Sequence, residues 1–253
     1  MALRLQNFLI GRYLPVLMAL LLPAACSKDN VRDCIKSKGN IKEQLRLLPE
    51  SIDSVFLGNR MNVEIVLDTA NFAIIRSGAN LVDLIETRSE GQIVVITDRN
   101  KCHWVRDLSH WPEVELHLKD VRIIATRGTN NIHSRHFLNY PQLTLDLWEH
   151  NGSVFLPVEN QETYIRQHTG ASDVTLIGRT EVLRVYMAGM SKGDYSNLTA
   201  IDAFIDQRSS GGMQAKVLGN LFVSIFGDGN VTVVGQPEIK KMERIGRGEL
   251  ILK

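Results

Sequence analysis

Three aspartates stand close to glycines in the C-terminal half of the chain, and carboxylates in turns are groups that can bind calcium or cleave polysaccharides. They are Asp173, Asp194 and Asp228, which lie far apart in the sequence. Calcium-binding β-rolls use a much denser nine-residue pattern, and glycoside hydrolysis needs two carboxylates about 5–9 Å apart. We therefore expect the three side chains to cap turns, not to form a calcium ladder or a row of catalytic acids.

Two sets of metal-ligating residues fail on number or spacing. His133 and His136 could place two imidazoles on one metal, but no third ligand is evident. The spacing of a second set matches no standard structural zinc pattern: Cys34, Cys102, His103 and His110. The chain also lacks a phosphate-binding loop, a nucleophile elbow and a metal-hydrolase helix motif. We predict no catalytic residue, no metal, no cofactor and no enzymatic activity.

The first residues have the anatomy of a secretory signal. Two arginines precede the apolar stretch 13–22, which ends in small residues just before Cys26. That stretch is shorter than the roughly 20 residues that a membrane-spanning helix needs. Residues 22–26, Leu-Pro-Ala-Ala-Cys, resemble the lipobox of bacterial lipoproteins, although proline replaces the usual leucine. The resemblance implies a signal peptide over 1–25, acylation of Cys26 and a lipidated tether over 26–37.

The remaining two cysteines leave a choice open. Cys34 and Cys102 lie far apart in sequence, and in an oxidising envelope compartment they can form a disulfide. A bridge would tie the N-terminal tail to the folded domain. Two free thiols fit the sequence equally well.

Charge and composition favour a β-fold without affinity for nucleic acid. The 29 basic and 28 acidic side chains leave a formal charge of +1, so nothing global attracts the chain to a polyanion. Aromatic residues make up 6% of the chain, whereas glycines number 19, which is typical of short strands and tight turns. We expect no nucleic-acid partner.

An internal repeat organises the C-terminal two-thirds. Alternating apolar segments begin at Leu143, Leu183, Ile201 and Leu221, and a weaker copy begins at Ile165. Each segment has the period of a strand with one buried face. The resulting period is about 19 residues.

Glycines recur in the turns between these segments. Gly170, Gly189, Gly227 and Gly246 occupy the same place in their respective copies of the repeat. A glycine at a fixed place in each repeat indicates a positive φ angle or the close approach of a neighbouring chain segment.

Energetics decide how the repeats must be arranged. One copy buries about five apolar side chains worth roughly 1.5–3 kcal/mol each, while ordering each of its residues costs about 1–2 kcal/mol. A single copy therefore cannot fold, but copies stacked in a solenoid share one core. We predict an all-β, parallel, single-stranded, right-handed β-helix over 114–253, with one copy of the repeat in each coil. A sandwich or barrel would not require a fixed glycine register.

The residues before this region do not follow the repeat clearly. We expect 38–113 to form a β-rich N-terminal cap that covers the open end of the core, with a short helix over 79–86. Trp104 and Trp111 fit such a cap better than a platform for stacking sugars.

The turns carry a family resemblance. Glycine, small residues and Asp or Asn recur in them, the chain closes with Gly-Gln-Pro-Glu at 235–238 and Gly-Arg-Gly at 246–248, and it opens with Lys-Gly-Asn-Ile at 38–41. Over 38–253 this pattern resembles the "putative auto-transporter adhesin, head GIN domain" family (DUF2807). The resemblance implies a single-stranded β-helix in a Bacteroidetes envelope protein, and it supplies no catalytic residues.

These observations predict a non-enzymatic outer-membrane lipoprotein, facing the periplasm or the cell surface, that contacts a glycan or protein ligand through the solenoid flank. The alternatives are a carbohydrate-active enzyme, which needs charged side chains from adjacent coils to converge on one face, and a structural scaffold. The oligomeric state is left open.

Overall fold

The computed structural model describes residues 37–100 and 111–253, and within these ranges the regular secondary structure is β-strand apart from one short 3-10 turn. The elements in chain order are β1 (Ile41–Leu47), β2 (Ser54–Gly58), β3 (Met61–Leu67), β4 (Phe72–Gly78), the 3-10 turn η2 (Val82–Leu84), β5 (Ile85–Glu90), β6 (Ile93–Asp98), β7 (Glu113–Leu118), β8 (Ile123–Arg127), β9 (Asn130–His133), β10 (Gln142–Trp148), β11 (Ser153–Gln167), β12 (Asp173–Met187), β13 (Lys192–Gln207), β14 (Met213–Val217), β15 (Asn220–Ile225), β16 (Val231–Val234), β17 (Glu238–Arg244) and β18 (Leu250–Leu252). No helix in the described ranges is long and apolar enough to cross a membrane.

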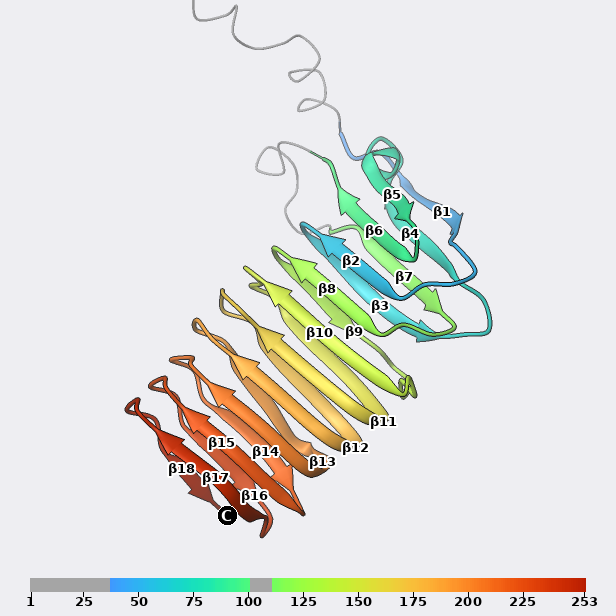
Figure 1. Ribbon diagram of the computed structural model, residues 1–253. Helices are drawn as coiled ribbons and strands as arrows, with labels where there is room; N and C mark the ends of the chain where they lie inside the picture. Colours follow the sequence, from blue (N-terminus) through green and yellow to red (C-terminus); the bar gives the residue numbers. More distant parts are fainter. Residues whose placement is uncertain (1–36, 101–110) are drawn as a thin grey trace, which may run out of the picture. The chain divides into compact units, whose positions relative to one another are not determined.

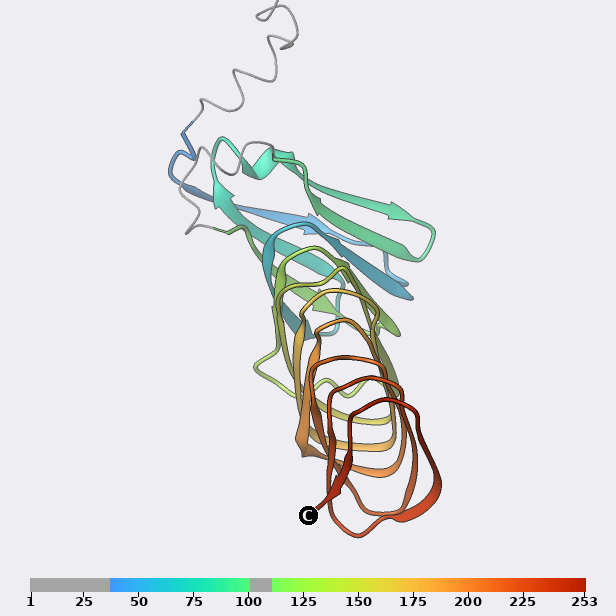
Figure 2. The ribbon, with the colours of Figure 1, turned by 90° about the vertical axis from the view of Figure 1, so that its left-hand side faces the viewer.

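The strands form two facing parallel sheets, which we name face A and face B. Face A runs through β6, β2, β8, β10, the second halves of β11, β12 and β13, and then β15 and β17. Face B runs through β7, β3, β9, the first halves of β11, β12 and β13, and then β14, β16 and β18. Figure 1 shows the coils in succession, and Figure 2 shows them as stacked loops.

The register of these pairs shows how the chain advances from coil to coil. On face B, Val154 pairs with Val174, and Val174 pairs in turn with Gly193. On face A, Ala203 pairs with Leu221. Each step to the next coil therefore uses one copy of the sequence repeat, and the predicted parallel solenoid is confirmed.

One predicted strand position is wrong. The sequence pattern predicts that Ile201 starts a buried row with Ala203 and Ile205, but its side chain is 47% exposed while Ala203 is fully buried. The cause is a corner: β13 continues from face B to face A, so two residues separate the buried Ala200 from the buried Ala203. Strict alternation breaks where one strand turns between two sheets.

The N-terminal region contributes both to the stack and to its end. Parallel pairing places β2 between β6 and β8, and β3 between β7 and β9. On the other side of β6 and β7, the pairing becomes antiparallel: β5 pairs with β6, β4 pairs with β7, and β1 pairs with β4. The expected helix over 79–86 is wrong except for the 3-10 turn η2, because Ile85 already starts a strand paired with β6.

A half-buried arginine closes this end of the core. The guanidinium of Arg46 donates hydrogen bonds to the carbonyl oxygens of Val82 (3.0 Å) and Ile85 and to the hydroxyl of Thr87 (2.8 Å). Carbonyls at the start of η2 and of β5 are thereby satisfied by a side chain from β1. The end of the solenoid is thus closed by polar contacts as well as by strands.

The four repeat glycines face two different constraints. Gly170 and Gly189 have φ angles of 109° and 71°, in the left-handed region. A Cβ on Gly227 would lie 2.3 Å from the Ser209 carbonyl oxygen, and one on Gly246 would lie 2.1 Å from the Gly227 carbonyl oxygen. Both constraints disfavour a side chain, and both arise where one coil passes over the next.

Buried polar side chains satisfy the backbone at these corners. The Gln207 amide nitrogen lies 2.9 Å from the carbonyl oxygens of Gly211 and Gly229, so it links its own turn to the next coil. The Gln167 amide nitrogen likewise lies 2.9 Å from the Ser172 hydroxyl in its own turn and 3.1 Å from the Lys192 carbonyl oxygen of the next coil. Such hydrogen bonds remove the cost of leaving corner carbonyls unpaired in the core.

Candidate functional site

The three aspartates singled out in the sequence do not all meet at one site. Asp194 accepts hydrogen bonds from the backbone N–H of Ser196 (3.0 Å) and from its hydroxyl (2.6 Å), a local capping contact. Asp228 pairs with Arg247 from the next coil, and this contact holds the pKa of the Asp228 carboxyl below its usual value. Asp173 and Asp194 line one shallow trough. In the described ranges no three His, Cys, Asp or Glu side chains are grouped to hold a metal ion.

The two histidines also take different roles. His133 lies on the outside of face B, with its Nε2 atom 3.8 Å from a carboxylate oxygen of Glu64. The backbone N–H and carbonyl of His136 instead contact the Ser134 hydroxyl. Glu64 is held at 3.0 Å by the Arg135 guanidinium, a cation that competes with any metal.

Several predicted residues lie outside the described ranges. These are Cys26, Cys34, Cys102, Trp104, His103 and His110. Acylation, the disulfide and the zinc alternative therefore stay predictions. Trp111 is described, and the Arg60 guanidinium lies 4.4 Å from the centre of its ring. That contact covers ring surface that a stacked sugar would need.

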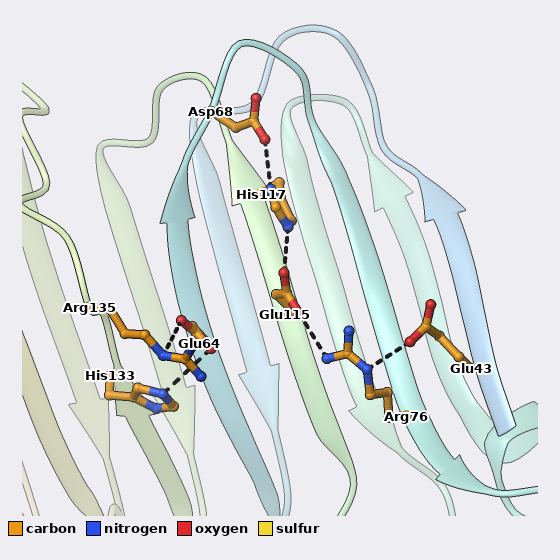
Figure 3. Close-up of polar contacts among 8 residues, drawn as sticks. All are labelled: Glu43, Glu64, Asp68, Arg76, Glu115, His117, His133 and Arg135. Atoms are coloured by element: carbon orange, nitrogen blue, oxygen red, sulfur yellow. Dashed lines mark hydrogen bonds and ion pairs between the residues drawn. The ribbon is translucent and has the colours of Figure 1, made fainter. Parts of the chain in front are cut away.

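A connected group of charged side chains lies on the outside of face B, and no sequence motif predicted it. Asp68, His117, Glu115, Arg76 and Glu43 form a continuous chain of contacts across four neighbouring segments (Figure 3). The distances along it are 2.7, 3.0, 2.8 and 2.7 Å. We name these five residues the face B network.

The centre of the network is a histidine between two carboxylates. His117 Nδ1 lies 2.7 Å from Asp68 and Nε2 lies 3.0 Å from Glu115, while Phe72 stacks on the ring at 4.0 Å. Each ring nitrogen therefore has one carboxylate oxygen within hydrogen-bond distance. The hydrogen bond from His117 is the main cause that lowers the pKa of Asp68.

Arg76 continues the network toward the edge of the sheet. It contacts Glu115 and Glu43, and these carboxylates raise the pKa of its guanidinium. In return, Arg76 is the main cause that lowers the pKa of Glu115, with His117 adding to the effect. These neighbours therefore favour the ionised form of the Asp68 and Glu115 carboxyls.

A groove of about 380 Å³ lies beside the network. Its lining comes from three adjacent strands of face B, from β4 and from the turn after β9: Asn62, Glu64, Arg76, Glu113, Val114, Glu115, His133 and Arg135. Parallel register brings them together, because Asn62 pairs with both Glu113 and Asn131. The groove offers carboxylate acceptors beside amide, imidazole and guanidinium donors, which suits a ligand with many hydroxyl or peptide groups.

The sequence held only a weak signal for this site. Glu113, Glu115 and His117 alternate on one face of a strand, and so do Asn62 and Glu64. These residues lie close together because the order of the coils in the stack differs from their order along the chain. The alternation of polar and apolar residues does not reveal that order.

The outside of face A carries aromatic side chains, and most of them stack on one another. Phe204 and Phe222 stack at 4.6 Å with an interplanar angle of 5°, and Arg184 covers Phe204 at 4.5 Å. Trp148 and His168 stack at 3.7 Å. Because these ring faces contact one another, they do not offer a flat platform to a sugar ring.

Solved structures share this fold at low sequence identity. A "putative adhesin" from Bacteroides fragilis NCTC 9343 matches with a TM-score of 0.77 and 17% identity, over 85% of this chain and 97% of that one. Similar proteins described as putative adhesins come from Parabacteroides merdae ATCC 43184 (TM-score 0.60, 14% identity, 87% and 98% covered) and Parabacteroides distasonis ATCC 8503 (0.58, 12%, 85% and 98%). At these identities the likeness establishes the fold.

No curated protein sequence matches the chain. A family model does match, over residues 52–237, and this is well over half of the chain. The match spans the solenoid from β2 to the turn after β16 and includes the groove. The chain therefore belongs to the family described as "Putative auto-transporter adhesin, head GIN domain" (DUF2807).

Proposed function

We propose that the protein is a non-enzymatic, adhesin-like module of the bacterial cell envelope that binds a glycan or protein ligand in the groove on face B. The observation that carries the proposal is the groove itself, in which the charged groups of Glu64 and Arg135 and the imidazole of His133 lie next to Asn62 and Glu113. The family description and the fold shared with proteins described as adhesins support the same role.

The chemistry of the groove favours hydrogen bonding to an extended ligand. Carboxylates accept from vicinal hydroxyls or peptide N–H groups, while guanidinium and amide groups donate to hydroxyl or carbonyl oxygens. The ion pairs around the groove pre-arrange these groups, which lowers the entropy lost on binding.

The binding proposal is tested on the full-length protein with a glycan array and a pull-down of envelope proteins. For any ligand found, Glu64→Gln should weaken binding at least about tenfold, because it replaces a charged acceptor by an amide. The matched control is Asp228→Asn, which makes the same replacement in the distant ion pair with Arg247. Equal losses in both variants, or no ligand in either screen, contradict the proposal.

Anchorage is part of the proposal. Cleavage after residue 25 and acylation of Cys26 would place the protein at the outer membrane through its lipid chains. Labelling with a clickable palmitate analogue should mark the wild-type protein and not Cys26→Ala. An unlabelled wild-type protein, or a Cys26→Ala variant that stays membrane-bound, contradicts lipidation.

A carbohydrate-active enzyme is the second candidate, because acidic and basic side chains from adjacent coils do converge on face B. Glycoside hydrolysis needs a carboxylic acid that is protonated near neutral pH. The lowered pKa values of Asp68 and Glu115 oppose that role. Release of reducing sugar from any bound glycan by the wild type, lost in Glu64→Gln, would favour the enzyme.

A further inference from the structure

Strand β1 carries its apolar side chains on the side that faces solvent, the opposite of what is usual in a strand that covers a core. Ile41, Leu45 and Leu47 are 62%, 64% and 83% exposed. The side that faces the interior carries Gln44 and Arg46 instead. The alternation of a half-buried strand is therefore inverted.

The inverted orientation is fixed by contacts on both faces. Arg46 donates to Val82 and Thr87 inside the cap, and Gln44 contacts Asp83 at 2.5 Å. On the outside, Glu43 accepts from Arg76 at 2.7 Å. A slip by one residue would turn the leucines inward but would break all of these hydrogen bonds.

The exposed leucines belong to a larger apolar surface. Leu47 pairs with Phe72 and Leu45 pairs with Ile74, and these two β4 side chains are half-buried on the same face. The charge of Glu43 within this row is matched by Arg76. We name Ile41, Leu45, Leu47, Phe72 and Ile74 the β1 stripe; it lies on β1 and β4, which extend face B at the N-terminal end (Figure 1).

We propose that the β1 stripe rests on the lipid surface that receives the acyl chains of Cys26. The inference depends on the proposed lipidation. Ile41 follows Cys26 by about 15 residues, and a chain of that length spans at most about 50 Å. The tether therefore keeps the stripe next to the membrane at a high effective concentration.

The chemistry of the stripe fits this occupant. All five side chains are aliphatic or phenyl groups, the outer edge of β1 is open in the described part of the chain, and the charge of Glu43 within the row is paired. Apolar side chains of this kind enter the boundary between lipid headgroups and acyl chains. Contact with the bilayer would orient the N-terminal end of the solenoid toward the membrane.

The test uses full-length Leu47→Trp protein, acylated in cells and reconstituted into phosphatidylcholine vesicles with brominated acyl chains. Bromine quenches tryptophan only at contact, so the emission added by the new residue should fall at least about twofold relative to unbrominated vesicles. Wild-type protein gives the baseline for the three native tryptophans. Leu218→Trp is the matched control, because Leu218 is 51% exposed on a distant coil and should not be quenched.

The outcomes distinguish a lipid surface from a second copy of the chain as the partner of the β1 stripe. Mass spectrometry of the intact protein first establishes whether Cys26 is acylated. A missing lipid anchor is thereby distinguished from an anchored protein whose β1 stripe does not contact the membrane. An acylated Leu47→Trp protein without quenching overturns the inference, and Leu45→Trp provides a second reporter if the first variant does not fold. A blue shift that depends on protein concentration without vesicles would assign the stripe to a second copy of the chain and also overturn it. Ile41→Glu added to Leu47→Trp should abolish the quenching.

Discussion

His150 shows what burial does to a titrating side chain inside the stack. Its ring is fully buried, and its Nε2 atom lies 2.9 Å from the Asn130 carbonyl oxygen of the preceding coil. Burial is the main cause that lowers the pKa of His150 below its usual value. The native protein therefore holds this imidazole neutral where the unfolded chain would begin to protonate it.

This difference predicts a loss of stability in mild acid. Below about pH 6.5 the unfolded chain binds a proton at His150, whereas the folded state, with its lower pKa, does not. The free energy of unfolding therefore falls as pH falls. Between pH 7.5 and 5.5 the melting temperature should fall about 3 °C more in the wild type than in His150→Gln. Scanning calorimetry measures this, and the exposed His136→Gln variant should behave as the wild type does. Parallel curves for wild type and His150→Gln would refute the assignment.

Gly170 gives a second prediction at this scale. Its φ angle is 109°, and a Cβ would lie 2.2 Å from the His150 carbonyl oxygen. Gly170→Ala should therefore lower the free energy of unfolding by about 2–3 kcal/mol, as measured by urea denaturation. Gly91→Ala is the matched control, because Gly91 also has a positive φ angle but has no atom within 4 Å of the added Cβ. Equal losses would mean that backbone strain alone, without the coil contact, sets the cost.

At the scale of single residues, the sequence predicted the recurring glycines but missed the network around His117. A glycine at a fixed interval reflects a local backbone constraint, which sequence carries directly. Asp68, Glu115 and Arg76 meet only because distant strands lie side by side, and nothing local to each residue signals that. The exposure of Ile201 was missed because a corner is a property of the coil, not of the alternation.

At the scale of elements, the strands of face A are tied together by their outer side chains as well as by backbone hydrogen bonds. Phe204 on β13 and Phe222 on β15 stack in register, and Arg184 on β12 extends the row. Stacked rings on neighbouring parallel strands stabilise the sheet beyond the area they bury.

A double-mutant cycle measures this contribution. Phe204→Ala and Phe222→Ala should each lower the free energy of unfolding by about 1–3 kcal/mol, with a coupling energy of about 0.5–1.5 kcal/mol between them. Phe155→Ala serves as the control, because Phe155 is exposed on face B and should couple to neither. Strictly additive effects of the two substitutions would show that the rings do not stabilise one another.

Elements were predicted well where hydrophobic alternation decides them and poorly at the N-terminal end. The rows beginning at Leu143, Leu183 and Leu221 became strands because each needs one buried face. Strand β1 has an apolar row that stays outside, and its orientation depends on hydrogen bonds from Arg46 to a segment much further along the chain. Periodicity contains no information about such a contact.

At the scale of the whole molecule, a coil in the middle of the stack has neighbours on both sides, whereas the last described coil has one. Within the described residues, β17 pairs with β15 and β18 pairs with β16. In a solenoid the stability of each repeat is the sum of its own term and its neighbour terms. Opening should therefore begin at the last coil and proceed inward.

Hydrogen exchange followed by mass spectrometry tests this order. Amides of β17 and β18 should exchange at least about tenfold faster than those of β12 and β13 under native conditions. Strands β15 and β16 should fall between them. Uniform protection from β12 to β18 would mean that the stack opens as a single cooperative unit.

Strands β2 and β3 lie between strands that follow them in the chain, so the protein should tolerate truncation differently at its two ends. Removing whole layers from the C-terminus leaves a complete, smaller stack. Removing residues 54–67 instead takes out an internal layer, so that β6 and β7 lose the parallel partners that they have within the described residues. Engineered versions of this protein should therefore be trimmed or extended at the tail, whereas the segment near its beginning has to be kept whole.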